Sequence, residues 1–384
     1  MNIPVLYDPS IEHDSVWSEE ILVAISKEAL TKKYNLVLFD SQNYRAVDYD
    51  NLFGSEPRLV LMVSAEQEWM EEVFCFFEAK RIQVVLVGAD LHMRSCVQAQ
   101  VDADHFKDIE TAIDLLARCG CTRSALYGVF PNSYSDNQKR KYFESSMHRR
   151  YTSPPEQLCF ENRSGLTDCY RAFREHMSGY DSLICVNGFA AASLMHHLTA
   201  DNIRVPDDIQ VVTFGGTRLS ELTKPALSVI SSDASSIGQN AVRTYRYLYN
   251  AGMTNLRLTT TLAGELIVRE STKILDEAFS EESQTFPTSS SLHRFYNDEE
   301  VRFFDALEKL LTKADVLDFQ IIQHLNEGRS YEKMAQLLHL TKNAVFYRIK
   351  RMREIAGFSG MNTFRKFICE YAEYFSRVSS PPLL

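Results

Sequence analysis

Basic and aromatic side chains near the carboxyl terminus have the spacing of a helix that could lie in a DNA groove. Between Lys342 and Lys366 there are seven Lys or Arg residues and one acidic residue, Glu354. Apolar residues recur every three or four positions from Val345 to Ile355, which predicts one inward-packing helix face. On the opposite face, an amide can read adenine, a cation can read guanine, and an aromatic ring can contact a thymine methyl.

The residues predicted to contact DNA are Lys342, Asn343, Phe346, Tyr347, Arg348, Lys350, Arg351 and Arg353. Two of them, Arg348 and Arg353, flank the reading face and are expected to contact phosphates. A solvated helix face would carry the same charges. It would not explain the adjacent Phe346 and Tyr347, although that pair could instead pack on a following helix at 362–375.

Capping residues delimit two helices around this face. Ser330 can cap a short helix that ends near Leu338, and Thr341 can cap a longer one that Gly357 ends. His339 stands in the turn, where many such motifs have Gly. The pattern predicts a helix-turn-helix at residues 330–356.

Charge is distributed unevenly along the 384 residues. The net charge is -10, yet residues 298–384 hold 13 Lys/Arg against 12 Asp/Glu, whereas residues 1–297 hold 28 against 39. An acidic body that carries one basic stretch is typical of a discrete polyanion-binding module.

The first 275 residues alternate short apolar runs with amphipathic helical stretches. This pattern predicts parallel sheets covered by helices, and the number of units favours two lobes. We expect lobe 1 at about 1–101 and 231–263, and lobe 2 at about 102–229 and 264–275. The predicted strands are 3–7, 35–39, 59–63, 84–87, 125–129, 182–186, 210–214, 227–231 and 262–268.

A linker is expected at 276–297, where acidic residues precede Pro287-Thr288-Ser289-Ser290-Ser291. Residues 298–384 then show helical periodicity throughout. The predicted fold class is therefore α/β, with two lobes of parallel sheet followed by an all-α domain that contains the helix-turn-helix.

Several classes of protein are excluded by what the sequence lacks. It has no apolar run long enough for a membrane span and no basic leader, so we expect a cytoplasmic protein without a membrane partner. The eight cysteines lack paired metal-ligand spacing and are expected to be reduced, buried thiols. Nucleotide-binding glycine loops, HExxH and Gly-x-Ser-x-Gly are absent, so we expect no catalytic residues, metal or cofactor.

The run from Leu340 to Phe358 resembles the C-terminal helix-turn-helix of regulators of the purine-catabolism-regulator type. The resemblance covers about residues 314–375 and departs at Ala344 and Phe346, where Thr and Arg are usual. Glu327-Gly328 is similar to the start of the module in quorum-sensing and response regulators. The resemblance implies binding to double-stranded DNA.

The body resembles the effector domain of the lactose-repressor family and its periplasmic sugar-binding relatives. The resemblance rests on Arg204–Phe214 and on Leu266–Ser271, and it spans about residues 3–272. It implies two lobes joined by crossings near Val101-Asp102, Val229-Ile230 and 262–265, with a ligand cleft between them. It also implies that the DNA-binding headpiece usual at the amino terminus is missing, since Ile3 begins the first strand.

The candidate cleft residues that the resemblance implies are Asp8, Trp17, Ser64, Asp90, Ser135, Lys139, Asn187 and Gly215. Lys139 stands where the family has Arg, and Gly215 stands where it has Asp. Such carboxylate and guanidinium groups bind neighbouring hydroxyls in pairs. We therefore expect a ligand other than a typical sugar, or none. Trp17 could stack on a ligand ring or simply anchor the first helix.

Together these features predict a ligand-responsive, DNA-binding transcriptional regulator that acts as a homodimer, with a sugar-like or other metabolite as effector. A regulator whose degenerate sensor serves only dimerisation or protein partners is the alternative. A stand-alone binding protein whose tail mediates protein contacts remains a third.

Overall fold

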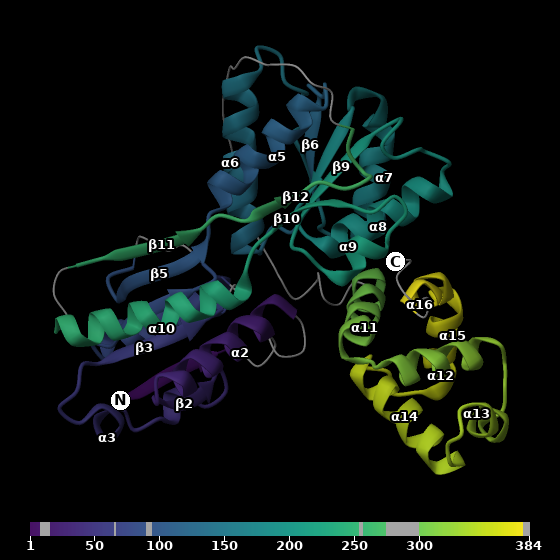
Figure 1. Cartoon of the computed structure of the whole chain (residues 1–384). Helices are drawn as coiled ribbons and strands as arrows, with labels where there is room; N and C mark the ends of the chain where they lie inside the picture. The colour runs from purple at the N-terminus through teal and green to yellow at the C-terminus, as the bar shows by residue number, and fades with distance from the viewer. Residues whose placement is uncertain (8–15, 65–66, 90–93, 253–255, 274–298, 379–384) are drawn as a thin grey trace.

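The computed structural model describes residues 1–7, 16–64, 67–89, 94–252, 256–273 and 299–378. Two six-stranded sheets, each flanked by helices, form two lobes, and a group of helices follows them (Figure 1). The predicted linker 276–297 and the candidates Asp8 and Asp90 lie outside the described residues.

The first sheet has the strand order β11-β5-β4-β3-β1-β2, and all its pairs are parallel. Aliphatic side chains on one face pack against α2 and α10, while the other face packs against the aromatic residues of α3 and α4. The strands are β1 (Asn2–Tyr7), β2 (Asn35–Asp40), β3 (Leu59–Val63), β4 (Gln83–Val87), β5 (Val97–Ala103) and β11 (Leu258–Leu262). The helices are α2 (Val16–Thr31), α3 (Tyr49–Phe53), α4 (Gln67–Ala79) and α10 (Ala234–Ala251), with a short 3-10 turn, η1 (Tyr44–Ala46).

The second sheet has the order β12-β10-β9-β8-β6-β7, in which only β12 runs antiparallel to its neighbour. Its strands are β6 (Ser124–Val129), β7 (Cys159–Glu161), β8 (Ser182–Cys185), β9 (Gln210–Phe214), β10 (Ser228–Ser231) and β12 (Glu265–Ile267). Its helices are α5 (His105–Arg118), α6 (Tyr134–Arg150), α7 (Leu166–His176), α8 (Gly188–Ala200) and α9 (Arg218–Leu222), with η2 (Met177–Gly179) after α7.

The chain crosses between the lobes three times: from β5 to α5, from β10 to α10 and from β11 to β12. These are the three places where the resemblance predicted crossings. The apolar runs predicted as strands lie in β1–β4, β6 and β8–β10.

The sequence analysis missed β5, β7 and β11, whereas the strand-like segment predicted at 262–268 contains the crossing after β11 and the strand β12. The sequence pattern failed to predict β5 because of its composition. Its alternate residues Gln98, Gln100 and Asp102 are polar yet buried, so it does not form an apolar run.

Six helices occupy residues 299–378, where the structure contains no strand. They are α11 (Glu299–Lys313), α12 (Val316–Asn326), α13 (Tyr331–Leu337), α14 (Lys342–Ile355), α15 (Met361–Glu370) and α16 (Ala372–Val378). The apolar face of α11 contacts α8 and α9 of lobe 2 on one side and α14 on the other, so lobe 2 and the helices share one hydrophobic cluster. None of the helices that the structure describes is long and apolar enough to span a membrane.

The cysteine prediction is partly wrong. Cys75 on α4 and Cys369 on α15 are exposed, and Cys159 is half-buried, while the other five thiols are buried.

The α11–lobe 2 contact contains a buried carboxylate, Glu308, whose pKa is raised by burial even though two backbone N–H groups of α9 donate to it. A raised carboxyl pKa stabilises the fold fully below the ordinary value of 4.5, and this contribution is lost as the pH rises through the folded-state pKa. We therefore expect the stability of Glu308→Gln relative to the unchanged protein to increase from pH 4.5 upward. Thermal unfolding of both proteins across that range measures it, and a difference that falls with pH would contradict it.

Candidate nucleic-acid interface and ligand cleft

The two motif helices begin and end as the capping residues predict. The hydroxyl of Ser330 accepts a hydrogen bond from Lys333 N–H at the start of α13, and that of Thr341 accepts one from Ala344 N–H (3.1 Å) at the start of α14. Met334 and Ala335 of α13 are buried, as are Val345, Ile349 and Met352 of α14. Burial of these residues holds the second helix across the first and leaves the opposite side of α14 toward solvent.

The turn between the helices holds His339 in the left-handed region, with φ 53°. This explains why related motifs favour glycine here, since a Cβ destabilises this backbone conformation by roughly 1–2 kcal/mol. Glycine also loses more backbone entropy on folding, by roughly 0.5–1 kcal/mol. We expect His339→Gly to raise the free energy of unfolding by about 0.5 kcal/mol, measured by urea denaturation. His339→Ala retains the Cβ and should give no such gain, and equal effects of the two changes would contradict the explanation.

The predicted reading face of α14 is open. Phe346 is 49% exposed and Tyr347 is 65% exposed, and their rings meet edge to face at 5.8 Å. The side chains of Lys350 and Arg351 are 50% and 49% exposed, and Lys342 and Asn343 are exposed as well. The alternative in which Phe346 and Tyr347 pack on the following helix is therefore wrong.

The two arginines predicted to contact phosphates, Arg348 and Arg353, also make contacts within the fold, and their binding to DNA stays a prediction. The Arg348 guanidinium donates to Asp315 (2.8 Å) and to Asp318 (2.7 Å), and the side chain of Asp318 is fully buried. Arg353 donates to the carbonyl of Ser359 (3.1 Å), and its side chain is 26% exposed. Arg348 thus joins α14 to the capping box at the start of α12.

The two lysine ion pairs of this face are weak and solvent-exposed. Lys342 pairs with Glu332 of α13, and Lys350 lies 3.8 Å from Glu354 one turn later. Exposed pairs of this kind contribute about 0–1 kcal/mol, so both lysines remain available to an anionic partner.

The cleft candidates are used mainly by the fold. The buried Lys139 ammonium donates to Ser135 Oγ (2.9 Å) and to the Val186 carbonyl (3.1 Å), and it lies 3.6 Å from Asp136 Oδ1. The Asn187 side chain accepts from Ala190 N–H and so caps α8. Lys139 and Asn187 therefore do not converge as free ligand groups.

Of the other described candidates, Ser64 and Gly215 follow strands, and Trp17 lies in the first turn of α2. Trp17 packs against Gly88, where an added Cβ would lie 3.1 Å from its ring, which favours the anchoring interpretation of this tryptophan. Ser64 is buried after β3. Gly215 has φ +82°, and an added Cβ would meet only open space there. The glycine thus leaves space beside the carboxyl end of β9 without supplying a polar group.

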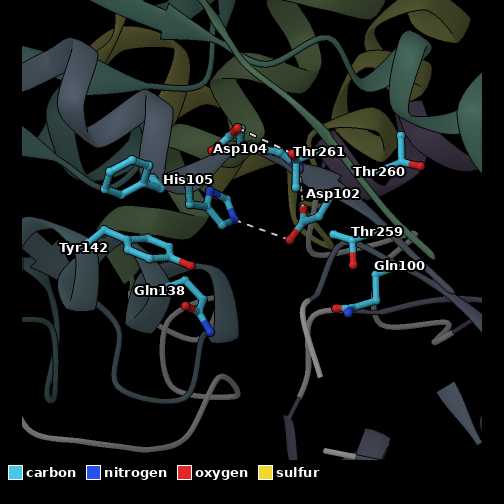
Figure 2. A pocket seen from close by; sticks show the side chains of 11 residues that line it. Gln100, Asp102, Asp104, His105, Gln138, Tyr142, Thr259, Thr260 and Thr261 are labelled. Carbon is cyan, nitrogen blue, oxygen red and sulfur yellow. Dashed lines mark hydrogen bonds and ion pairs between the residues drawn. The ribbon is translucent and has the colours of Figure 1, made fainter. Parts of the chain in front are cut away.

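A small polar pocket of about 60 Å³ lies beside the first crossing, between β5, β11, α5 and α6 (Figure 2). Inside it, His105 Nε2 lies 3.5 Å from Asp102 Oδ2, and both side chains are at least nine-tenths buried. Among the residues that the structure describes, neither His105 ring nitrogen nor Asp102 Oδ2 has a hydrogen-bond partner. A sugar-sized site needs roughly 300 Å³ or more, so this pocket suits ordered water rather than an effector. The sequence analysis did not predict this pocket. The one feature of the sequence that pointed to it is the alternation of polar residues along β5.

Burial also raises the pKa of two nearby carboxyls, Asp108 and Asp136. Asp108 accepts from Gly264 N–H (2.7 Å) in the third crossing, and Asp136 pairs with Lys139. Charged groups thus surround the hinge between the lobes. Within the described residues, no group of three or more His, Cys, Asp or Glu side chains could hold a metal ion.

The architecture defines a class of protein. Two parallel α/β lobes joined by three crossings are the periplasmic-binding-protein-like fold, which confirms the predicted two-lobed fold. Residues 113–272 match the periplasmic binding protein-like domain family.

Individual relatives are transcriptional regulators. Catabolite control protein A of Staphylococcus epidermidis is 19% identical over 233 residues, which are 60% of this chain and 70% of that protein. Catabolite control protein A of Staphylococcus xylosus is 29% identical over 121 residues, which are 31% of this chain and 32% of that protein. The chain is thus similar to catabolite control protein A over part of its length.

Solved structures give the same fold. A putative LacI transcriptional regulator from Bacillus cereus subsp. cytotoxis has a TM-score of 0.58 at 13% identity, covering 72% of this chain and 99% of that one. The LacI-family regulator CCPA from Weissella paramesenteroides, with bound sucrose, has a TM-score of 0.55 at 18% identity, covering 72% and 100%.

Proposed function

We propose that this protein is a DNA-binding transcriptional regulator whose two lobes sense a small molecule and whose α14 reads DNA. The observation that carries the proposal is the open face of α14, where Phe346, Tyr347, Lys350 and Arg351 are exposed on the second helix of a helix-turn-helix. Similarity of the lobes to regulators such as catabolite control protein A supports it.

Contacts on DNA follow from the chemistry of this face. Asn343 would read adenine, Lys350 and Arg351 would read guanine, and Phe346 would contact a thymine methyl. Lys342 and Tyr347 at the edge of the face would bind phosphates. Arg348 and Arg353 would hold α14 in place instead.

The sensor is proposed to bind a ligand other than a typical sugar. Lys139 and Asn187, which the resemblance implied as ligand residues, are occupied by contacts within lobe 2. The same observation favours the second candidate, a regulator whose sensor serves only dimerisation or protein partners. Thermal shift against a metabolite collection separates them, because a ligand at 100 times its dissociation constant should stabilise the fold by about 2.7 kcal/mol. Tight binding of an unmodified hexose would contradict the ligand proposal.

We further propose that the protein acts as a cytoplasmic homodimer. Two reading helices related by a two-fold axis would match half-sites one or more helical turns apart on double-stranded DNA. Selection of bound duplexes from a random pool tests both parts of the proposal. It should return a palindromic site whose affinity falls with salt, whereas recovery of no preferred sequence would contradict the reading role of α14.

A further inference from the structure

The carboxyl half of α11 contacts lobe 2 through a buried carboxylate. Glu308 is 3% exposed and accepts from the backbone N–H groups of Arg218 (3.1 Å) and Leu219 (2.8 Å) at the start of α9. Arg218 returns a hydrogen bond from its guanidinium to the carbonyl of Leu311. Phe304 and Leu307 of α11 lie in the same hydrophobic cluster as lobe 2. Removing either side of this contact would leave buried polar groups without partners, so α11 must move with lobe 2.

The α9 anchor lies next to the interlobe hinge. Gly215-Gly216-Thr217 separate β9 from α9, and a Cβ on Gly216 would lie 2.6 Å from Ser231 Oγ at the end of β10. The chain crosses back to lobe 1 immediately after Ser231. The residues of α9 that bind Glu308 therefore lie next to this turn and close to the crossing. A change in the backbone conformation of either one would move them.

Lobe 1 contacts the last residue of the same helix. Lys313 Nζ lies 3.0 and 3.3 Å from the two carboxylate oxygens of Glu19, in the first turn of α2. Both side chains are partly exposed, at 45% and 35%. Pairs with this exposure contribute about 0–1 kcal/mol, so this contact can break and re-form as the lobes move.

The reading helix contacts that residue too. Arg351 of α14 donates to the carbonyl of Lys313 (3.0 Å) and lies 3.6 Å from the buried Asp318. Lys313 thus touches lobe 1 through its side chain and the reading face through its backbone. Lobe 1, lobe 2 and α14 meet within residues 308–313.

We propose that α11 is the lever that couples the angle between the lobes to the reading helix, with Glu308 as its fixed anchor on lobe 2 and the Lys313–Glu19 pair as its releasable contact with lobe 1. This inference rests on the proposed DNA-binding function. When the lobes separate, the pair breaks, and the end of α11 that supports Arg351 loses its contact with lobe 1.

The native cysteines allow a direct test. Cys75 on α4 of lobe 1 and Cys369 on α15 are exposed, whereas the other thiols are buried or half-buried. Spin labels on these two residues report the distance between lobe 1 and the helical domain by double electron–electron resonance. In a Cys75→Ser control, any remaining dipolar signal comes from a spin label on a cysteine other than these two.

The variants reverse the charges of the pair singly and together. Glu19→Lys and Lys313→Glu should each broaden and shift the Cys75–Cys369 distance distribution, and the double reversal should restore it. Glu299→Lys, at an exposed position at the other end of α11, is the matched control and should change nothing. Glu308→Ala should broaden the distribution further, because it removes the fixed anchor.

Binding to a selected duplex is the second measurement. If the two reversals changed DNA binding only through their charges, the effect of the double variant on the dissociation constant would equal the product of the two single effects. We expect the double variant to differ from that product by at least about threefold. If the single reversals leave the distance distribution unchanged, the proposed role of α11 is wrong. If the distances change but the effects on DNA affinity are additive, α11 does not couple the lobes to α14. If the unchanged protein selects no duplex, the proposed function fails, while the distances still decide whether α11 couples the lobes.

Discussion

Replacing Lys350 and Arg351 together by alanine is expected to abolish sequence-specific DNA binding while the protein remains folded. Both side chains are half exposed on α14, and neither contributes to the buried face of Val345, Ile349 and Met352. A cation that reads a base in the major groove contributes about 1–3 kcal/mol. Loss of two such contacts should raise the dissociation constant at least about 30-fold.

Fluorescence anisotropy with a duplex from the selected pool measures this loss, and circular dichroism checks the fold. The matched control is Lys27→Ala with Lys107→Ala, which removes the same charge from exposed positions on α2 and α5. The control should retain most of the affinity. Equal losses in both double variants would show that overall charge, rather than the α14 face, binds DNA.

Replacing Arg348 by alanine is expected to destabilise the helical domain rather than simply to weaken DNA binding. Its guanidinium pairs with Asp315 and with Asp318, and the change would leave the fully buried Asp318 carboxylate without its closest cation. Breaking a buried pair by removing one partner costs about 3–5 kcal/mol. Arg351, 3.6 Å from Asp318, compensates in part, so we expect a loss of about 2–3 kcal/mol.

Urea unfolding measures the loss, and a second variant identifies its cause. Arg348→Met combined with Asp318→Asn removes both charges and keeps a side-chain oxygen that can accept from Asp315 N–H, so it should recover most of the stability that Arg348→Ala loses. A variant Arg348→Ala with unchanged stability and reduced DNA affinity would instead restore the phosphate contact that the sequence predicted.

The structure divides the basic residues of the tail into two groups. Lys342 and Lys350 are exposed and have only exposed partners, whereas Arg348 and Arg353 are bound to neighbouring loops and helices. Arg351 is intermediate, because it is half exposed but also donates to the Lys313 carbonyl and lies 3.6 Å from Asp318. All five looked alike in the sequence. The proposed reading face consequently contains fewer residues than the sequence predicted. Phe346 and Tyr347 form a larger part of this smaller face.

The cleft was the least predictable region. The resemblance placed Lys139 and Asn187 at ligand-binding positions, but each satisfies backbone groups of its own lobe. Asp8 and Asp90 lie outside the described residues, so their roles as ligand groups remain predictions. Trp17 packs on Gly88, a position where a larger residue would collide with the indole.

The amino-acid sequence by itself determined the features that depend on near neighbours. Ser330 and Thr341 cap the helices they precede, because a hydroxyl needs only the N–H groups three residues away. The apolar stripe of α14 and the buried strands follow from periodicity in the same way. These features correctly predicted which face of α14 is exposed.

Only the tertiary structure decided which charges are free. Arg348 donates to Asp318, thirty positions earlier, and Lys139 donates to the Val186 carbonyl. Lys313 pairs with Glu19 near the opposite end of the chain. Such pairings depend on how helices and lobes pack, and charge energies change steeply with distance and burial. No local pattern encodes those distances, so the lever role of α11 and the internal role of Arg348 emerge only once the elements are assembled.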